Sequence, residues 1–234
     1  MSVRVFADGP FEAGSVLELD DAEAHYLARV RRRTIGDVVD VLDGRGTVAR
    51  AIVESLGKRV ARVRIEALAP AQPPPTLRLA CALLDPKAML EAITHATEFG
   101  AASITFLRCE RSSFDAPGDR RVEAAIRAAQ RQSGRAAPLS VHGPLTLEEL
   151  VRNRHEGETW LLAEPAAQRP VGPIDPAALL LVGPEGGFTD AERQQLTRAG
   201  ASPLGLSNHV LRAPTACLSG LSVLHALRRT PSQT

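Results

Sequence analysis

The spacing of hydrophobic residues changes along the chain at about residue 70. Before that point, short apolar runs alternate with polar residues at a period of two, as in half-buried β-strands. The predicted strands cover residues 3–6, 15–19, 38–42, 47–55 and 59–68. Asp43-Gly44-Arg45-Gly46 has the composition of a hairpin turn, and residues 21–33 show helical spacing instead. The pattern therefore predicts a small β-barrel interrupted by one short helix.

Beyond residue 76, predicted strands and helices alternate. Asp85 before Pro86 marks one helix start, and Thr189 with Glu192 three residues later forms a capping box at another. This alternation favours an α/β fold with a mostly parallel sheet covered by helices on both faces. The predicted strands cover residues 77–83, 103–107, 159–163, 178–182 and 203–206, and the helices begin at residues 86, 119, 190 and about 214.

A proline-rich segment, residues 70–75, separates the two patterns. Proline fixes φ and lacks an N–H group, so this segment resists helix and central strand alike and is expected to be a semi-rigid linker. We therefore predict a first domain at residues 1–70, a linker at residues 71–76 and a second domain at residues 77–234. With 44% hydrophobic residues, the 234-residue chain can bury a substantial core.

Composition narrows the expected compartment and site chemistry. No apolar run approaches the length of a membrane span, and the N-terminus lacks the pattern of a secretory signal, so we expect a cytoplasmic protein without a membrane partner. Cys81, Cys109 and Cys217 are too widely spaced for a disulfide framework or a C-x-x-C zinc pattern. The six histidines show no metal-ligand spacing either. We therefore expect no metal site.

The net charge of +1 conceals two local clusters of arginine. One cluster comprises Arg29, Arg31, Arg32 and Arg33, and the other comprises Arg108, Arg111, Arg120, Arg121, Arg127, Arg131 and Arg135. Either cluster could be a solvated helix surface balanced by acidic residues. Both together favour nucleic-acid binding, because the planar guanidinium donates paired hydrogen bonds to phosphate. With 3% aromatic residues, a base-stacking platform is not indicated.

Two turns late in the chain have the composition of a small-molecule site. The apolar run at residues 178–182 leads into Gly183-Pro184-Glu185-Gly186-Gly187, and residues 204–212 form a second turn before a helix. Glycines let a backbone approach a ligand closely, although one such loop could equally be a plain strand-to-helix connection. The spacing fits neither a dinucleotide fingerprint nor a phosphate-binding loop. A nucleoside triphosphate is therefore not expected.

Several short segments occur in a specific order over nearly the whole chain. They are residues 1–11, 25–31, 96–100 (Ala-Thr-Glu-Phe-Gly), 110–112, 132–135 (Gln-Ser-Gly-Arg), 181–188 and 211–216 (Leu-Arg-Ala-Pro-Thr-Ala). Each alone is a weak signal, but their ordered occurrence resembles the ribosomal RNA small subunit methyltransferase E family of the SPOUT superfamily. The glycine loop and the Leu-Arg-Ala-Pro-Thr-Ala segment weigh most.

The resemblance implies a PUA-like β-barrel followed by an α/β domain whose chain forms a deep trefoil knot. It further implies a homodimer that binds S-adenosylmethionine in the knot and methylates N3 of one uridine in 16S small-subunit ribosomal RNA. The substrate would be the ribosomal RNA or the assembled small ribosomal subunit. Because N3 lies on the base-pairing edge, the target base must be unpaired or flipped out.

The resemblance also implies which residues hold the cofactor. The cofactor-binding residues expected from it are Leu162, Ala163, Glu164, Val182, Gly183, Pro184, Glu185, Gly186, Gly187, Leu206, Ser207, Val210 and Leu211. Backbone groups of the last four would hold the adenine. Glu185 could pair with a cationic part of the ligand or cap backbone N–H groups of its own loop.

Catalytic and RNA-binding candidates follow from the chemistry. Methyl transfer to N3 requires a group that accepts the uridine proton and groups that stabilise negative charge on the uracil oxygens, so we consider Glu110, Arg111, Arg135 and Arg212. The candidates for RNA binding are Arg4, Arg29, Arg31, Arg33, Arg111 and Arg135.

The sequence departs from the family pattern at a few positions. Pro214 stands where an acidic or small polar residue is common, His95 where lysine is common, and Arg131 where glutamate is common. Ser207-Asn208-His209 replaces a Gly-Pro-Arg-like segment, so side-chain contacts from this loop are in question. Two alternatives therefore stay open: a knotted methyltransferase for another RNA position, and an RNA-binding homologue without catalysis.

Overall fold

The computed structural model of the chain describes residues 2–72, 74–165, 167–168, 173–175 and 177–227. Its contacts divide it into two compact units. The first consists of residues 1–73 and 130–138, and the second of residues 74–129 and 139–234. The first unit thus includes a short segment that follows the proline-rich linker by more than fifty residues in sequence.

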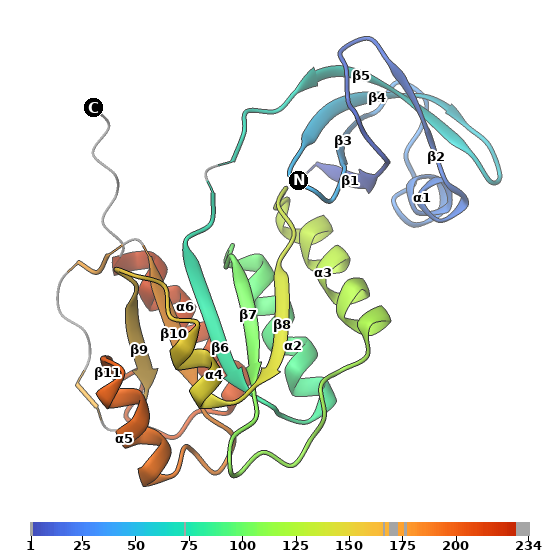
Figure 1. Cartoon of the computed structure of the whole chain (residues 1–234). Helices are drawn as coiled ribbons and strands as arrows, with labels where there is room; N and C mark the ends of the chain where they lie inside the picture. The colour runs from blue at the N-terminus through green and yellow to red at the C-terminus, as the bar shows by residue number, and fades with distance from the viewer. Residues whose placement is uncertain (1, 73, 166, 169–172, 176, 228–234) are drawn as a thin grey trace. The chain divides into compact units, whose positions relative to one another are not determined.

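The first unit contains a curled five-stranded sheet in the order β1-β3-β4-β5-β2 (Figure 1). Its strands are β1 (Val3–Phe6), β2 (Val16–Leu19), β3 (Val38–Leu42), β4 (Val48–Leu56) and β5 (Ala61–Leu68). β1 pairs in parallel with β3, and the other pairs are antiparallel. All five predicted strands are confirmed. In the predicted hairpin turn between β3 and β4, the Asp43 carboxylate accepts backbone N–H bonds from residues 45–47 at 2.8–3.0 Å.

The predicted helix of the first unit is shorter than its sequence pattern. Helix α1 (Asp21–His25) begins after Asp20, whose carboxylate accepts the Glu23 N–H at 2.8 Å, and continues as a π-helix, η1 (Tyr26–Val30). The arginines that follow leave the helix, and Arg32 adopts a φ of 50°. The wider π turn changes which side chains share a face, which period-3.6 reasoning does not anticipate.

The segment from residue 130 onward joins the first unit through Arg131. Its guanidinium lies 4.1 Å from the ring centroid of Tyr26 and 5.3 Å from that of Phe6, and it pairs with the buried Glu23 carboxylate at 2.5 Å. Arg4 donates to the backbone carbonyls of Arg131 and Gln132 at 3.1 and 2.7 Å. Cation–π contact and ion pairing therefore bind this segment to the sheet.

The second unit is built on a parallel six-stranded sheet in the order β11-β9-β10-β6-β7-β8. Its strands are β6 (Leu77–Ala82), β7 (Ser103–Leu107), β8 (Ser140–Leu145), β9 (Thr159–Ala163), β10 (Ala178–Val182) and β11 (Ala201–Leu204). Along β10, Leu180 and Val182 enter the core on one face, and Leu179 and Leu181 enter the core on the other. Burial on both faces explains the unbroken apolar run in the sequence.

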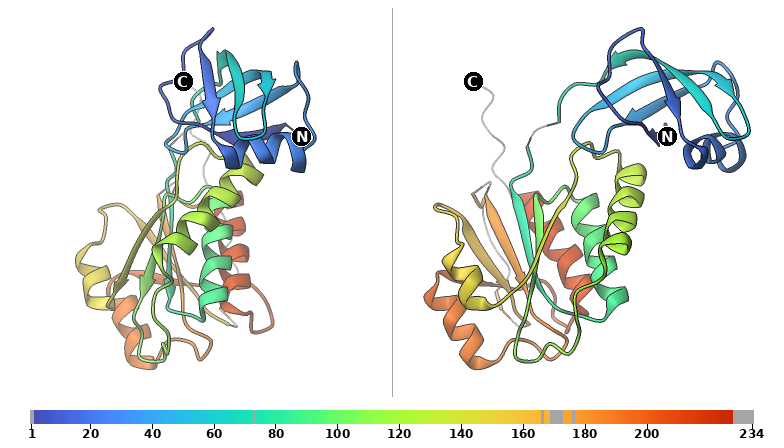
Figure 2. Two further views of the ribbon diagram at one scale, coloured as in Figure 1. Left: turned by 90° about the vertical axis from the view of Figure 1, so that its right-hand side faces the viewer. Right: turned by 45° about the vertical axis from the view of Figure 1, so that its right-hand side comes forward.

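Helices cover both faces of this sheet, as predicted. They are α2 (Pro86–Glu98), α3 (Asp119–Ser133), α4 (Leu147–Arg152), α5 (Asp190–Arg198) and α6 (Ala213–Leu227). Helices α2 and α6 pack on one face, and α4 and α5 pack on the other (Figure 2). The Asp85 cap, the Pro86 start and the capping box of Thr189 and Glu192 are all confirmed.

The sequence patterns do not predict β8 or α4, and they place β11 two residues too late. Strand β8 contains Gly143-Pro144 and lies at the sheet edge with a mostly exposed surface, so it lacks an apolar run. Helix α4 has six residues, too few to show a period, although Thr146 and Glu149 form a capping box. The strand expected at residues 203–206 is β11, which ends at Leu204 because the backbone of Gly205 turns toward another segment.

That segment is the connection after β9. The Gly205 N–H donates to the Gln168 carbonyl at 2.9 Å, and a Cβ atom on Gly205 would lie 2.0 Å from the Ala167 carbonyl oxygen. The chain after β11 therefore passes this connection at backbone contact. Within the described ranges, no helix is long and apolar enough to cross a membrane, and no cluster of potential metal ligands occurs.

Candidate functional site

A pocket of about 290 Å³ lies at the carboxyl ends of β9, β10 and β11. Parallel strands bring their carboxyl ends to one edge, where α/β proteins commonly bind ligands. Three connections form the walls: residues 163–165 after β9, residues 182–188 after β10 and residues 206–211 after β11. Ala213 and Ala216, from the first turn of α6, complete the lining with small side chains.

The loop after β10 has its shape fixed on its inner side by Phe188. This side chain is buried, and a Cβ on Gly183 would lie 2.9 Å from the Phe188 ring. Gly187 has a φ of 69°, and its N–H donates to the Pro184 carbonyl at 2.8 Å. The glycines therefore permit a tight turn packed on an aromatic ring, and the pocket side of the loop presents mostly backbone.

Helix α5 holds the end of this loop through a buried carboxylate. Glu192 Oε2 accepts the Thr189 N–H at 2.7 Å, and the Thr189 hydroxyl accepts the Glu192 N–H at 3.3 Å. Glu192 Oε1 accepts the backbone N–H of Glu110, from the connection after β7, at 2.8 Å. One side chain thereby ties the glycine loop to a second loop.

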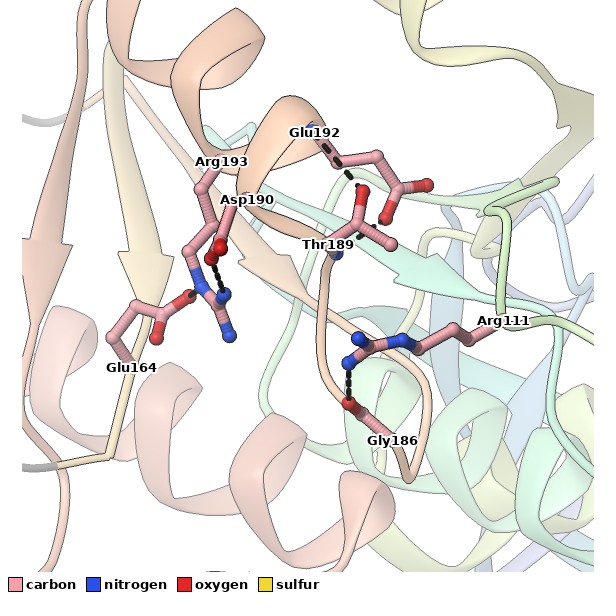
Figure 3. Close-up of polar contacts among 7 residues, drawn as sticks. All are labelled: Arg111, Glu164, Gly186, Thr189, Asp190, Glu192 and Arg193. Carbon is pink, nitrogen blue, oxygen red and sulfur yellow. Dashed lines mark hydrogen bonds and ion pairs between the residues drawn. The ribbon is translucent and has the colours of Figure 1, made fainter.

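Arg111 makes the next contact between the same two loops. Its guanidinium donates to the Gly186 carbonyl at 2.5 Å, and its Cδ lies 3.2 Å from the position of a Gly186 Cβ (Figure 3). Sequence reasoning proposed Glu110 as a reacting group and Arg111 as a reacting and RNA-binding group, but neither as a contact between loops. Their connection to the glycine loop has no linear sequence signal, because β7 and β10 are more than seventy residues apart.

An ion-pair network forms the polar side of the pocket. Arg193 Nε donates to Glu164 at 2.8 Å, and its Nη1 donates to Asp190 at 2.9 Å (Figure 3). The hydrogen bond that Arg193 donates to the Glu164 carboxylate is the main cause that raises the pKa of Arg193. Arg193 and Glu164 both line the pocket, so the network links the connection after β9 to α5.

The structure brings together all of the expected cofactor residues except Leu162 around this one pocket. Leu162 is buried in the core beneath α4 and α5 instead, because alternate residues of β9 face opposite sides of the sheet. The lining residues that sequence reasoning missed are Pro165, Phe188, Arg193, His209, Ala213 and Ala216. The unusual Ser207-Asn208-His209 turn is closed by a hydrogen bond from the His209 N–H to the Ser207 hydroxyl at 3.0 Å.

The catalytic candidates fall in different units. Glu110, Arg111 and Arg212 belong to the second unit, and Arg135 belongs to the first. Arg135 is buried, donates to the Pro138 carbonyl at 3.1 Å and has its pKa lowered to about 10 by desolvation, so it stays protonated at neutral pH.

The candidates for RNA binding also differ in their surroundings. Arg4 is engaged with backbone carbonyls and lies 4.0 Å from Asp40, and Arg33 lies 3.9 Å from Asp37. Arg29 and Arg31 are exposed.

The cysteines have the properties of buried hydrophobic residues. Cys217 Sγ lies 3.8 Å from Cys81 Sγ between α6 and β6. Contact with the Cys217 thiol and burial hold the pKa of Cys81 well above its usual range, and burial raises the pKa of Cys109 to about 12. Thiols that stay protonated at neutral pH are poor nucleophiles.

The chain matches two known domain families and several known proteins. An RNA methyltransferase domain model matches residues 71–225, and an RNA methyltransferase PUA domain model matches residues 19–66. Ribosomal RNA small subunit methyltransferase E of Mycobacterium bovis is 33% identical, with 97% of this chain and 92% of that protein covered. The protein of the same name from Synechocystis is 31% identical, with 91% and 74% covered.

Solved structures resemble the fold over 97% of the chain. A Legionella pneumophila protein in complex with bound cofactor SAM superimposes with a TM-score of 0.81 at 28% identity, with 97% of this chain and 98% of that chain covered. A ribosomal RNA small subunit methyltransferase E from Neisseria gonorrhoeae has the same TM-score and coverage at 23% identity, which shows the fold alone. Both parts of the chain match, and the identity extends across nearly all of a curated relative; the chain therefore belongs to the ribosomal RNA small subunit methyltransferase E family.

Proposed function

We propose that this protein transfers a methyl group from S-adenosylmethionine to N3 of a uridine in small-subunit ribosomal RNA. The observation that carries the proposal is the pocket at the carboxyl ends of β9, β10 and β11, in a chain that belongs to this methyltransferase family. Bound S-adenosylmethionine would supply an electrophilic methyl group, so the chain has no need of a metal for this chemistry.

The lining of the pocket fits this cofactor. The loops at residues 182–188 and 206–211 present backbone donors and acceptors suited to an adenine edge, and Ala213 and Ala216 leave room beside them. Glu185 is exposed, and its carboxylate has no hydrogen-bond partner among the described residues, so it is available to a cationic group. We assign cofactor contact to the expected residues that line the pocket, and to Arg193 and His209 in addition.

The reaction needs a proton acceptor for the N3–H of uridine and stabilisation of the charge that develops on the ring oxygens. We assign the role of proton acceptor to the carboxylate of Glu110, a residue whose backbone N–H is held by Glu192. We assign stabilisation of the developing negative charge to Arg111 and Arg212. Arg111 is fixed beside the pocket by its bond to Gly186. We keep Arg135, which belongs to the first unit, as a further candidate for charge stabilisation, because its buried guanidinium stays charged.

The proposal also includes an oligomeric state and a cellular compartment. We propose a homodimer that acts in the cytoplasm, where small ribosomal subunits are made. On α6, Leu221 and Leu224 are buried in the core, whereas Leu218 and Leu227 are half-buried and could contribute to a dimer face. Sedimentation analysis of the purified chain tests the dimer.

Incubation with S-adenosylmethionine and small ribosomal subunits from a strain that lacks uridine-N3 methylation tests the activity. We expect mass spectrometry of the digested RNA to show new N3-methyluridine, because the subunits offer an unmodified acceptor. Subunits that already carry the modification serve as the control and should incorporate none. Methylation at a different position would support the alternative of a methyltransferase for another RNA position. Absence of both methylation and cofactor binding would contradict an enzymatic role.

A further inference from the structure

A second cavity, of about 450 Å³, lies within the first unit and has no role in the cofactor site. Ala24, His25, Ala28 and Arg29 form one wall, and residues 56–58, at the turn between β4 and β5, form the other. This wall combines the last residues of α1 with residues of the π-helix η1. The small side chains of Ala24 and Ala28 leave the space, and Gly57 adds no side chain opposite them.

The charge of this cavity is of one sign. Its lining contains His25, Arg29 and Lys58 and no carboxylate. In the same unit, Arg62 and Arg64 are each paired with glutamates at 2.8–3.3 Å, and Arg131 is paired with Glu23. No ion pair or side-chain hydrogen bond of His25, Arg29 or Lys58 occurs among the described residues. A hollow lined by the two uncompensated cations Arg29 and Lys58, with the imidazole of His25 as a further hydrogen-bond donor, is suited to an anion.

The turn that carries Lys58 is held in place. The Gly57 N–H donates to the Val60 carbonyl at 2.8 Å, and a Cβ on Gly57 would lie 2.8 Å from that oxygen. On the opposite wall, the Asp20 cap fixes the start of α1, and Ala24 is buried in the core of the unit. The two backbones are therefore anchored, and only the cationic ends of the side chains must be ordered by a ligand.

We propose that this cavity binds a phosphate group of the ribosomal RNA backbone, through His25, Arg29 and Lys58. The inference rests on the proposed function, which makes small-subunit ribosomal RNA the polyanion that the protein must hold. It adds a defined contact point in the first unit, distinct from Arg31 and Arg33. The scarcity of aromatic residues fits a contact to phosphate and not to a stacked base.

The experiment measures binding of the full chain to deproteinised small-subunit ribosomal RNA over a range of salt concentrations. The variants are Arg29→Ala and Lys58→Ala, and the matched control is Arg62→Ala, which removes the same charge from a residue paired with Glu18 at 3.3 Å. We expect each cavity variant to lose affinity about fivefold and to reduce the slope of log K against log salt by about 0.7 to 0.9, the value for one phosphate contact. Arg62→Ala should change the affinity and the slope by less than half as much as the cavity variants do.

The outcomes separate this inference from the proposed function. Cavity variants that bind like the control, with a wild-type protein that binds and methylates the RNA, would overturn the phosphate site alone. Loss of affinity for assembled subunits without loss for deproteinised RNA would assign the cavity to a ribosomal protein and would also overturn it. A wild-type protein that binds and methylates neither the deproteinised RNA nor the small ribosomal subunit would overturn both. Unchanged cofactor affinity in each variant confirms that the second unit is intact.

Discussion

Replacing Gly205 by alanine is expected to weaken S-adenosylmethionine binding by about 100-fold or more. The added methyl group would lie 2.0 Å from the Ala167 carbonyl oxygen, and the 2.9 Å hydrogen bond from the Gly205 N–H to Gln168 fixes that geometry. Relief of the clash must separate the connection after β9 from the connection after β11, which are two walls of the pocket. Overpacking of this kind costs about 3 kcal/mol, equivalent to two orders of magnitude in affinity.

Isothermal titration calorimetry measures the effect, with Gly118→Ala as the control. A Cβ on Gly118 would meet no atom within 4 Å, so this variant should bind the cofactor like the wild type. Trp160, the only tryptophan of the chain and buried in β9, reports through its fluorescence whether the second unit remains folded. A folded Gly205→Ala protein whose affinity stays within threefold of the wild type would contradict the tight passage and its role in the pocket.

The contrast between Gly205 and the glycine loop shows what sequence patterns can locate. The loop at residues 183–187 stands out because its glycines are consecutive and follow an unbroken apolar strand. Gly205 is a single glycine between two leucines. Its constraint comes from a backbone almost forty residues earlier, so only the folded chain reveals it.

The same distinction applies to the fold. Strands with a period of two, the Asp85 and Thr189 caps and the apolar run of β10 were predictable because each depends on neighbouring residues. Strand β8 was missed because an exposed edge strand buries too few residues to create a pattern. The attachment of residues 130–138 to the first unit depends on Arg131, Glu23 and two aromatic rings, which are distant in sequence.

For the candidate site, the family resemblance predicts which loops line the pocket, and the structure shows which side chains join these loops. The backbone walls follow from motifs, since each is a strand end followed by a turn. The side chains that join the walls were not among the predicted site residues: Arg193 pairs with Glu164, and Glu192 accepts the backbone N–H of Glu110. Glu192 appears in the sequence only as half of a capping box, yet its second oxygen holds another loop.

That second bond leads to the other large expected effect. Glu192→Ala should lower the free energy of unfolding of the second unit by about 2 to 5 kcal/mol, because it leaves the backbone N–H groups of Glu110 and Thr189 without their acceptors. With the Glu110 tether lost, the adjoining Arg111 and the Gly186 loop also lose their fixed separation. We therefore expect the methyl-transfer rate at saturating cofactor to fall at least about tenfold, as for other misplaced catalytic groups.

Helix α4 provides the matched control, because its capping box has the same composition and its Glu149 carboxylate binds no second loop among the described residues. Glu149 accepts the Thr146 N–H at 2.8 Å, so Glu149→Ala removes a cap alone and should cost about 1 kcal/mol with an unchanged transfer rate. Urea unfolding followed by Trp160 fluorescence gives the stability of both variants, and a single-turnover assay gives the rate. If Glu192→Ala matches Glu149→Ala in both measurements, Glu192 acts only as a helix cap, and the positions of Glu110 and Arg111 must depend on other contacts.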